Sequence, residues 1–149
     1  MNQNRGFTLI ELMVVIALVG MLALIVLAAL SSAKGRGDDA GIQSTMKNLQ
    51  TQSGLYYSQN GNVGVTSGDC VTAGSMFADA TTYGLSKLLT GLRAKTTVAC
   101  FSTAAPSNIW IISAQLKSDP TKYWCIDHGG ISRQRTQPAT STLTMCDAY

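Results

Sequence analysis

The sequence predicts an α+β fold in which one long N-terminal helix precedes a small antiparallel β-sheet. Three observations lead to this prediction: an apolar run at the start of the chain, an amphipathic helical pattern after it, and short strand-like segments separated by turns in the second half. With 149 residues, the chain is long enough for one domain with a modest core, so a large multidomain enzyme is excluded.

The apolar run extends from Phe7 to Leu30 and is interrupted only by Thr8, Glu11 and Gly20. Its charge-free part, residues 12–30, would measure roughly 28 Å as a helix, which is close to the thickness of a bilayer's hydrocarbon core. The charges that flank the run are nearly balanced and favour neither orientation strongly. We therefore expect a helix that crosses a membrane once.

Two ordinary explanations of this run leave features unexplained. A secretory signal has an apolar region of about 7 to 15 residues followed by a small-residue cleavage site. Ser31-Ser32-Ala33 is such a site, but the run is longer and contains Glu11, the only glutamate in the chain. A plain single-span anchor explains the length of the run but not the glutamate. A third explanation accounts for both features.

The segment Gly6-Phe7-Thr8-Leu9-Ile10-Glu11-Leu12 resembles the processing and assembly motif of type IV pilins and of the related pseudopilins of type II secretion systems. The resemblance implies that a prepilin peptidase cuts after Gly6 and N-methylates Phe7, the new N-terminal residue. Glu11 corresponds to the family's nearly invariant acid. Beyond Leu30 the resemblance concerns architecture only, and the proline that many type IV pilins carry in mid-helix is absent around residues 27–29.

The motif has a physical rationale. A carboxylate at the centre of a bilayer costs about 2.5–3.5 kcal/mol, so Glu11 is expected to have a positively charged partner. A helix does not fold its own terminus back well onto a residue one turn along, whereas a displaced parallel neighbour can place its Phe7 amine beside Glu11. At about 4 Å and an effective dielectric constant of about 20, this attraction is about 4 kcal/mol before desolvation. The pair is therefore expected to select the register between neighbours.

The resemblance also implies partners and a location. The partners are other copies of this chain in a helical homopolymer, the prepilin peptidase and an inner-membrane assembly platform. The subunit is expected in the inner (cytoplasmic) membrane as a single-pass protein before assembly, and in an extracellular pilus afterwards. The expected parts are a leader (1–6), a transmembrane and filament-core helix (7–33) and a globular head (34–149), which comprises an amphipathic helix (38–60), an αβ-loop (61–96), and a sheet with the C-terminal loop (97–149).

A second helical pattern follows the apolar run. Gly35, Gly37 and Gly41 predict a weak junction. After it, apolar and small residues recur at helical spacing and predict one face that packs on a sheet: Ile42, Met46, Leu49, Ser53 and Tyr56. The helix is expected to end near Gln59-Asn60-Gly61, where a left-handed residue is favourable. With the apolar run, it would form one helix of about fifty residues, half in the membrane and half in the head.

The rest of the chain predicts a loop, a short helix and a sheet. Residues 61–82 are rich in Gly, Thr, Ser and Asp, as loops are. Leu85, Leu88, Leu89 and Leu92 then indicate one side of a short helix. The strand-like stretches are Thr97–Ser102, Ile109–Leu116 and Lys122–Asp127, with a tight hairpin at His128-Gly129-Gly130. We expect a sheet of three or four antiparallel strands lying on the helix.

Four cysteines, Cys70, Cys100, Cys125 and Cys146, lie in the part expected to be exported. Their even number predicts two disulfides, for which three connectivities are possible. The family's habit of fastening its C-terminal loop with a disulfide, together with proximity in sequence, favours Cys70–Cys100 and Cys125–Cys146. A zinc site is not expected, because no Cys-x-x-Cys occurs and His128 is the only histidine.

No catalytic, cofactor or metal site is expected. His128 lies beside two glycines, as an exposed turn residue does, and no catalytic pattern accompanies it. Asp127 and Asp147 would approach each other if Cys125 bonds Cys146, but two carboxylates are too few to predict a calcium site. The net charge is only +3 and the lysines are scattered, so nucleic-acid binding is not expected; Arg133 and Arg135, near Trp124, indicate a solvated strand edge.

These observations predict a structural subunit of a type IV pilus rather than an enzyme. The four cysteines favour a pilin, since an extracellular fibre needs heads that resist shear and proteases. Three alternatives stay open: a pseudopilin of a type II secretion system, a membrane-anchored ectodomain that does not polymerise and keeps residues 1–6, and a secreted soluble domain that begins at Lys34.

Overall fold

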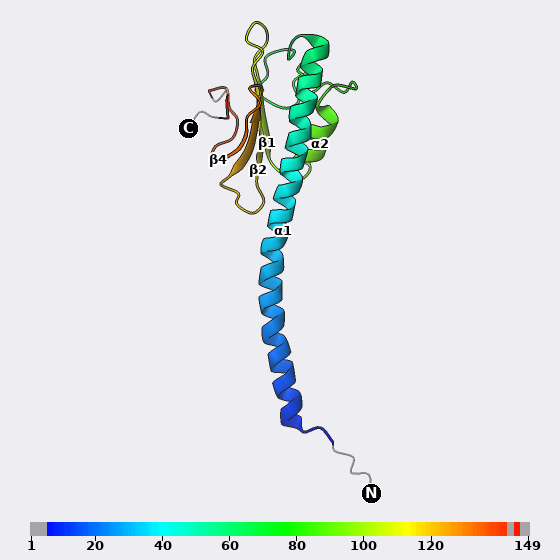
Figure 1. The fold of residues 1–149 in the computed structure, drawn as a ribbon, viewed down its shortest axis with the longest axis vertical. Coiled ribbons are helices and arrows are strands. Elements are labelled where there is room, and N and C mark those ends of the chain that lie inside the picture. Colours follow the sequence, from blue (N-terminus) through cyan, green and yellow to red (C-terminus); the bar gives the residue numbers. More distant parts are fainter. Residues whose placement is uncertain (1–5, 143–144, 147–149) are drawn as a thin grey trace. The chain divides into compact units, whose positions relative to one another are not determined.

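The computed structural model describes residues 6–142 and 145–146. The elements follow one another as a long helix, a short helix and four strands (Figure 1): α1 (Leu9–Asn60), α2 (Ser86–Arg93), β1 (Val98–Ser102), β2 (Trp110–Gln115), β3 (Tyr123–Asp127) and β4 (Ser132–Arg135). This order confirms the α+β prediction. The chain divides into two compact units, Met1–Gly35 and Arg36–Tyr149.

Helix α1 continues without a break through Gly35, Gly37 and Gly41, where the sequence analysis expects a weak junction. A glycine costs about 1 kcal/mol relative to alanine inside a helix, which weakens the helix but leaves its hydrogen bonds in place. The boundary between the two units follows Gly35 and so falls in this glycine-rich segment.

The part of α1 in the second unit buries the face that the sequence predicts. Ile42, Met46, Leu49, Ser53 and Tyr56 are all buried. At the end of the helix, Gly61 has a positive φ of 68° and donates its N–H to the Tyr57 carbonyl at 2.8 Å. Glycine adopts this conformation at little energetic expense. The helix therefore stops where the sequence predicts.

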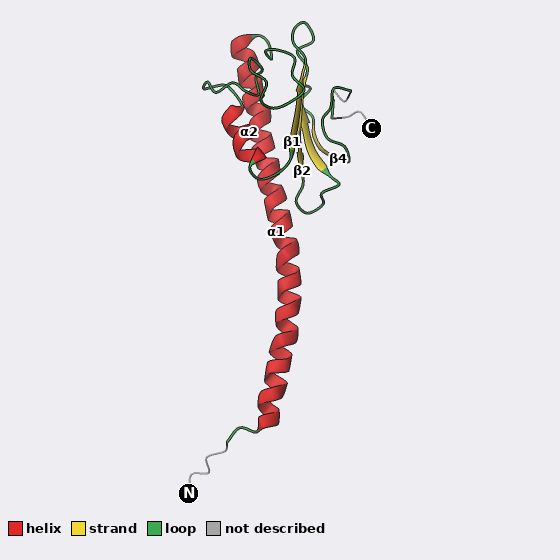
Figure 2. Ribbon diagram, turned by 180° about the vertical axis from the view of Figure 1, so that it is seen from behind, coloured by secondary structure: helices red, strands yellow, loops and turns green. Residues whose placement is uncertain are grey.

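The sheet is antiparallel, with strand order β1-β2-β3-β4. Its observed strands begin and end within one residue of those predicted, and β4 supplies the fourth strand after the Asp127–Ile131 hairpin. Strand β2, one of the two inner strands, has both faces covered. Ile112 and Ala114 join the core shared with α1 and α2, while Ile111 joins a smaller cluster on the opposite face. Figure 2 shows the strands together with α1 and α2.

The C-terminal segment covers that opposite face of the sheet. Cys146 is bonded to Cys125 of β3, and both sulfur-bearing residues are buried with Phe101, Ile111 and Ala139. The Ala139 N–H donates to the Ser113 hydroxyl at 2.7 Å. Although the segment has no regular periodicity, these contacts fasten it along the sheet.

The buried carboxylate of Asp127 organises the same end of the sheet. It accepts hydrogen bonds from the N–H groups of Gly129 at 2.9 Å, Ile131 at 3.1 Å and Cys146 at 2.7 Å. The first two close the β3–β4 hairpin, and the third holds the C-terminal segment. Asp127 therefore links the turn to the segment that carries the second disulfide.

The loop between α1 and α2 contributes more to the core than its composition predicts. Val63, Met76 and Phe77 are completely buried. Gly64 has a positive φ of 82°, and a Cβ there would lie 2.1 Å from the Gly74 carbonyl oxygen, so glycine is required for the loop to close on itself. These core residues are spaced irregularly, so no periodic pattern in the sequence indicates them.

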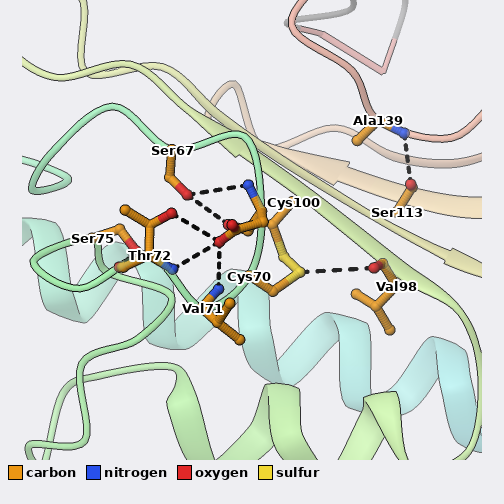
Figure 3. Close-up of a disulfide and its surroundings, with 10 residues drawn as sticks. Ser67, Cys70, Val71, Thr72, Ser75, Val98, Cys100, Ser113 and Ala139 are labelled. Carbon is orange, nitrogen blue, oxygen red and sulfur yellow. Dashed lines mark hydrogen bonds between the residues drawn. A yellow bond between two sulfur atoms is a disulfide. The ribbon is translucent and has the colours of Figure 1, made fainter.

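The first disulfide joins this loop to the edge strand β1 (Figure 3). It links Cys70 to Cys100, so the two disulfides join the same pairs of cysteines that the sequence analysis favours. Before Cys70, the Asp69 carboxylate accepts hydrogen bonds from the Val71 N–H and from the N–H and hydroxyl of Thr72. The hydrogen bond from the Val71 N–H has the largest effect on the pKa of Asp69. Together with the two bonds from Thr72, it holds this pKa below its usual value.

Asp39 anchors α1 to the turn between β2 and β3. Its side chain is buried, and its carboxylate accepts hydrogen bonds from the Lys117 N–H at 2.5 Å, the Ser118 N–H at 3.3 Å and the Ser118 hydroxyl. The residue next to it, Asp38, is exposed. Asp39 therefore supplies a polar contact between two elements that are otherwise held together by apolar packing.

We expect Asp39→Ala to destabilise the head by about 1–3 kcal/mol, because the N–H groups of Lys117 and Ser118 lose their acceptor in a partly buried position. Chemical denaturation of the full chain in detergent, followed by tryptophan fluorescence, measures this change. Asp38→Ala is the matched control and should leave the midpoint nearly unchanged. Equal midpoints for the two variants would contradict the anchoring role of Asp39.

Candidate functional site

The N-terminal part of α1 presents an apolar surface that the described chain does not cover. From Phe7 to Leu30 every large hydrophobic side chain is at least half exposed, and Phe7 is 85% exposed. Exposure of single apolar side chains is ordinary, but a continuous surface of this extent marks a membrane or protein contact. Lipid or other protein must therefore cover this part of the helix.

The same segment is long and apolar enough to cross a membrane. By length and composition, α1 contains one candidate span among the described residues, and none of that span is buried within the chain. A helix satisfies its own backbone hydrogen bonds, so it can lie in hydrocarbon without further polar partners. The structure is thus compatible with a segment that lies in lipid, in a bundle of helices, or first in one and then in the other.

Thr8 and Glu11 form a capping box at the start of α1. The Glu11 N–H donates to the Thr8 hydroxyl oxygen at 3.3 Å, and the Glu11 carboxylate accepts the Thr8 N–H at 2.9 Å and the Thr8 hydroxyl at 2.8 Å. Two N–H groups that a helix start normally leaves without partners are thereby satisfied. Glu11 therefore has a polar partner within its own chain.

The partner that the sequence predicts for Glu11 lies on a neighbouring chain, whereas this partner lies in the same chain. The signal is nevertheless present, since Thr-x-x-Glu before an apolar run is the usual spacing of a capping box. Both hydrogen bonds that the carboxylate accepts from Thr8 use Oε2. A carboxylate has about four lone-pair positions, so the capping box leaves Glu11 able to accept a further donor.

Phe7 and Glu11 lie together on one side of the helix start. With Ile10, Val14 and Val15 they line a shallow depression of about 310 Å³. Its walls are apolar except for the glutamate. A partner that fits this depression should combine apolar side chains with a single hydrogen-bond donor or positive charge.

Gly6 precedes Phe7 in a non-helical segment, and a Cβ at Gly6 would meet nothing within 4 Å. Packing within the described chain therefore gives no reason for glycine at this position. The expected leader is residues 1–6, of which 1–5 lie outside the described residues. Cleavage after Gly6 and methylation of Phe7 stay predictions.

The prediction of a solvated strand edge at Arg133 and Arg135 is wrong for Arg135, which is buried at the end of β4, whereas Arg133 is exposed. Arg135 donates to the Met145 carbonyl at 2.9 Å, and Trp124 donates its indole N–H to the Ser132 hydroxyl at 3.1 Å. The described residues contain no group of three His, Cys, Asp or Glu side chains suited to a metal ion. Asp147 lies outside the described residues, so its proximity to Asp127 is not tested.

Comparison with known proteins adds information about the N-terminal segment. Residues 1–27 match the family described as the prokaryotic N-terminal methylation motif. The chain is also similar to the type IV major pilin protein PilA of Myxococcus xanthus (strain DK1622), with 37% identity over 57 residues. That alignment covers 38% of this chain and 26% of the relative, so the chain spans about a quarter of the relative's length. No solved structure matches the chain significantly.

We expect Thr8→Ala to loosen the first turn of α1, because the substitution removes the hydroxyl that accepts the Glu11 N–H. Loss of such a cap typically amounts to about 1 kcal/mol, so the Glu11 amide should exchange with solvent roughly five times faster. Hydrogen exchange by NMR on the full chain in micelles measures this rate. Thr8→Ser keeps the hydroxyl and should exchange like the unaltered chain; an equal rate in Thr8→Ala would argue against the capping box.

Proposed function

We propose that this chain, which carries the N-terminal motif of the type IV pilin family, is a structural subunit of a type IV pilus. The observation that carries the proposal is the uncovered apolar surface of α1 between Phe7 and Leu30, which begins with the motif. The pilin family is structural rather than catalytic, and the name of the similar Myxococcus protein is that of a major pilin.

The proposed subunit has three parts. Residues 1–6 are a leader that a prepilin peptidase removes, residues 7–33 are the membrane and filament-core segment, and residues 34–149 are the head. After cleavage Phe7 carries a free amine, which N-methylation leaves positively charged. The subunit then remains in the inner membrane as a single-pass protein until an assembly platform in that membrane transfers it into the extracellular fibre.

Assembly replaces lipid around α1 with the helices of other copies. Apolar side chains packed against identical neighbours contribute about 25 cal/mol per Å² of surface removed from water, so this surface supplies the strength of the fibre once the subunit leaves the membrane. The contact joins unlike surfaces of successive copies. Such contacts do not close on themselves and propagate as a helical polymer.

Glu11 sets the register between successive copies. The Phe7 amine of one copy approaches the Glu11 carboxylate of the next, which keeps an oxygen available beside its capping box. Phe7 and Glu11 are four positions apart in the sequence, so the neighbouring helix is displaced along the fibre by roughly 6 Å plus the reach of the side chain. The capping box and the contact between subunits act together: the first orients the carboxylate and the second uses it.

We expect Glu11→Gln to reduce fibre assembly by at least about tenfold. The neutral amide removes the attraction to the incoming amine, which is about 4 kcal/mol before desolvation, while the apolar surface is unchanged. Electron microscopy of fibres sheared from cells, normalised to the subunit present in the membrane, measures the effect. Asp38→Asn changes an exposed acid outside the depression and should assemble normally; regular fibres formed at the usual rate by Glu11→Gln would refute the register contact.

We expect the subunit in fibres to begin at N-methylated Phe7, and Gly6→Leu to leave the leader attached. A side chain at position 6 would lie next to the Gly6–Phe7 peptide bond and would hinder access of the peptidase to it. Intact-mass and N-terminal peptide spectrometry distinguish the two forms. Asn2→Leu, a change in the leader away from the cut, should be processed normally, whereas a mature fibre built of chains that start at Met1 would disprove processing.

A further inference from the structure

A groove lies at the end of the head where α1 terminates, and it has no part in the assembly proposed above. Its volume is about 410 Å³, within the range of small-molecule sites. It is bounded by the last turns of α1, the loop between β1 and β2, and the turn between β3 and β4. Its lining includes Gly54, Tyr57, Asn108, Trp110, Asp127 and His128.

One wall of the groove is open because α1 carries a glycine there. Gly54 is exposed, and a Cβ built on it would meet nothing within 4 Å. One turn further along, Tyr57 keeps 44% of its surface exposed, whereas Trp110 at the start of β2 is buried. The groove thus combines the accessible aromatic ring of Tyr57 with open space above the backbone of Gly54.

The opposite wall is held in place by its own hydrogen bonds. The Thr103 N–H donates to the Ile109 carbonyl at 2.9 Å, and Asn108, with a positive φ of 48°, accepts the Val63 N–H on its side-chain oxygen at 3.3 Å. The His128 N–H donates to the Trp110 carbonyl at 3.0 Å. A site that is already ordered loses little conformational entropy when a ligand binds.

The groups that face the groove suit an uncharged ligand. No lysine or arginine lines it, and the Asp127 carboxylate is already bonded to three backbone N–H groups. The side-chain amide nitrogen of Asn108, the His128 imidazole and the Tyr57 hydroxyl make no hydrogen bond to any described residue. An anionic ligand would lose hydration here without gaining an ion pair, and a cationic ligand would meet only the Asp127 carboxylate, which is 1% exposed. A ligand with hydroxyl groups and an apolar face finds partners for both.

We propose that this groove binds a neutral saccharide, with one face of a pyranose ring against Tyr57 and its hydroxyl groups hydrogen-bonded to Asn108 and His128. A sugar ring has this combination of an apolar face and a polar rim. Because none of these residues belongs to the Phe7–Leu30 surface, sugar binding does not depend on whether the chain polymerises.

The test is saturation-transfer NMR on the full chain in lauryldimethylamine N-oxide, a detergent without a sugar head group. The probes are glucose, galactose, mannose and N-acetylglucosamine. At least one should give a saturable transfer signal from its ring protons. Gly54→Leu places a side chain in the open wall and should abolish the signal, and Tyr57→Ala should weaken it severalfold.

Gly91→Leu is the matched control, since Gly91 is an exposed helical glycine with open space that lies in α2 and away from the groove. It should retain the signal of the unaltered chain. Both leucine variants replace glycine in a helix, a change that favours folding, and a thermal melt by circular dichroism checks this. The proposal is overturned if none of the four sugars gives a saturable signal or if Gly54→Leu binds like the unaltered chain. It is also overturned if the groove resonances shift with protein concentration alone, because the groove is then a contact between copies.

Discussion

The organisation of this protein depends on one constraint, which is that water cannot cover the surface of α1 between Phe7 and Leu30. Nothing in the described chain folds over these side chains. The segment must therefore lie in lipid or against other helices. Glu11 is compatible with both surroundings because the capping box with Thr8 gives its carboxylate polar partners before any neighbour arrives.

The head is stable in a different way, since it completes its own core. The second part of α1, helix α2 and one face of the sheet bury a common apolar cluster, and the C-terminal segment covers the other face. Polar contacts act where apolar packing ends: Asp39 at the β2–β3 turn and Asp127 at the β3–β4 turn. A change in what surrounds the first unit therefore does not require the head to repack.

Much of this architecture could be predicted from periodic patterns. The buried face of α1 from Ile42 to Tyr56, the end of the helix at Asn60 and the limits of the strands follow from local spacing and turn chemistry. The burial of Asp39 could not be predicted, because its partners at Lys117 and Ser118 are distant in sequence. The same holds for Phe77, whose burial arises from an irregular loop. The Thr8–Glu11 pair is a different case, since the Thr-x-x-Glu spacing alone indicates a capping box.

The placement of the covalent cross-links bears on how the head responds to tension. Cys70–Cys100 joins the loop to β1 and Cys125–Cys146 joins the C-terminal segment to β3, so neither includes a residue of α1. Within α1, a pull reaches the sheet through the apolar cluster, the Asp39 carboxylate and the hydrogen bond from the Gln50 side chain to the Ile131 carbonyl, all of which are noncovalent. The covalent path begins only after Asn60, where the loop leads to the Cys70–Cys100 disulfide and β1. The disulfides hold the loop and the C-terminal segment on the sheet. In a head under mechanical load, the interface between α1 and the sheet would therefore be the first to separate.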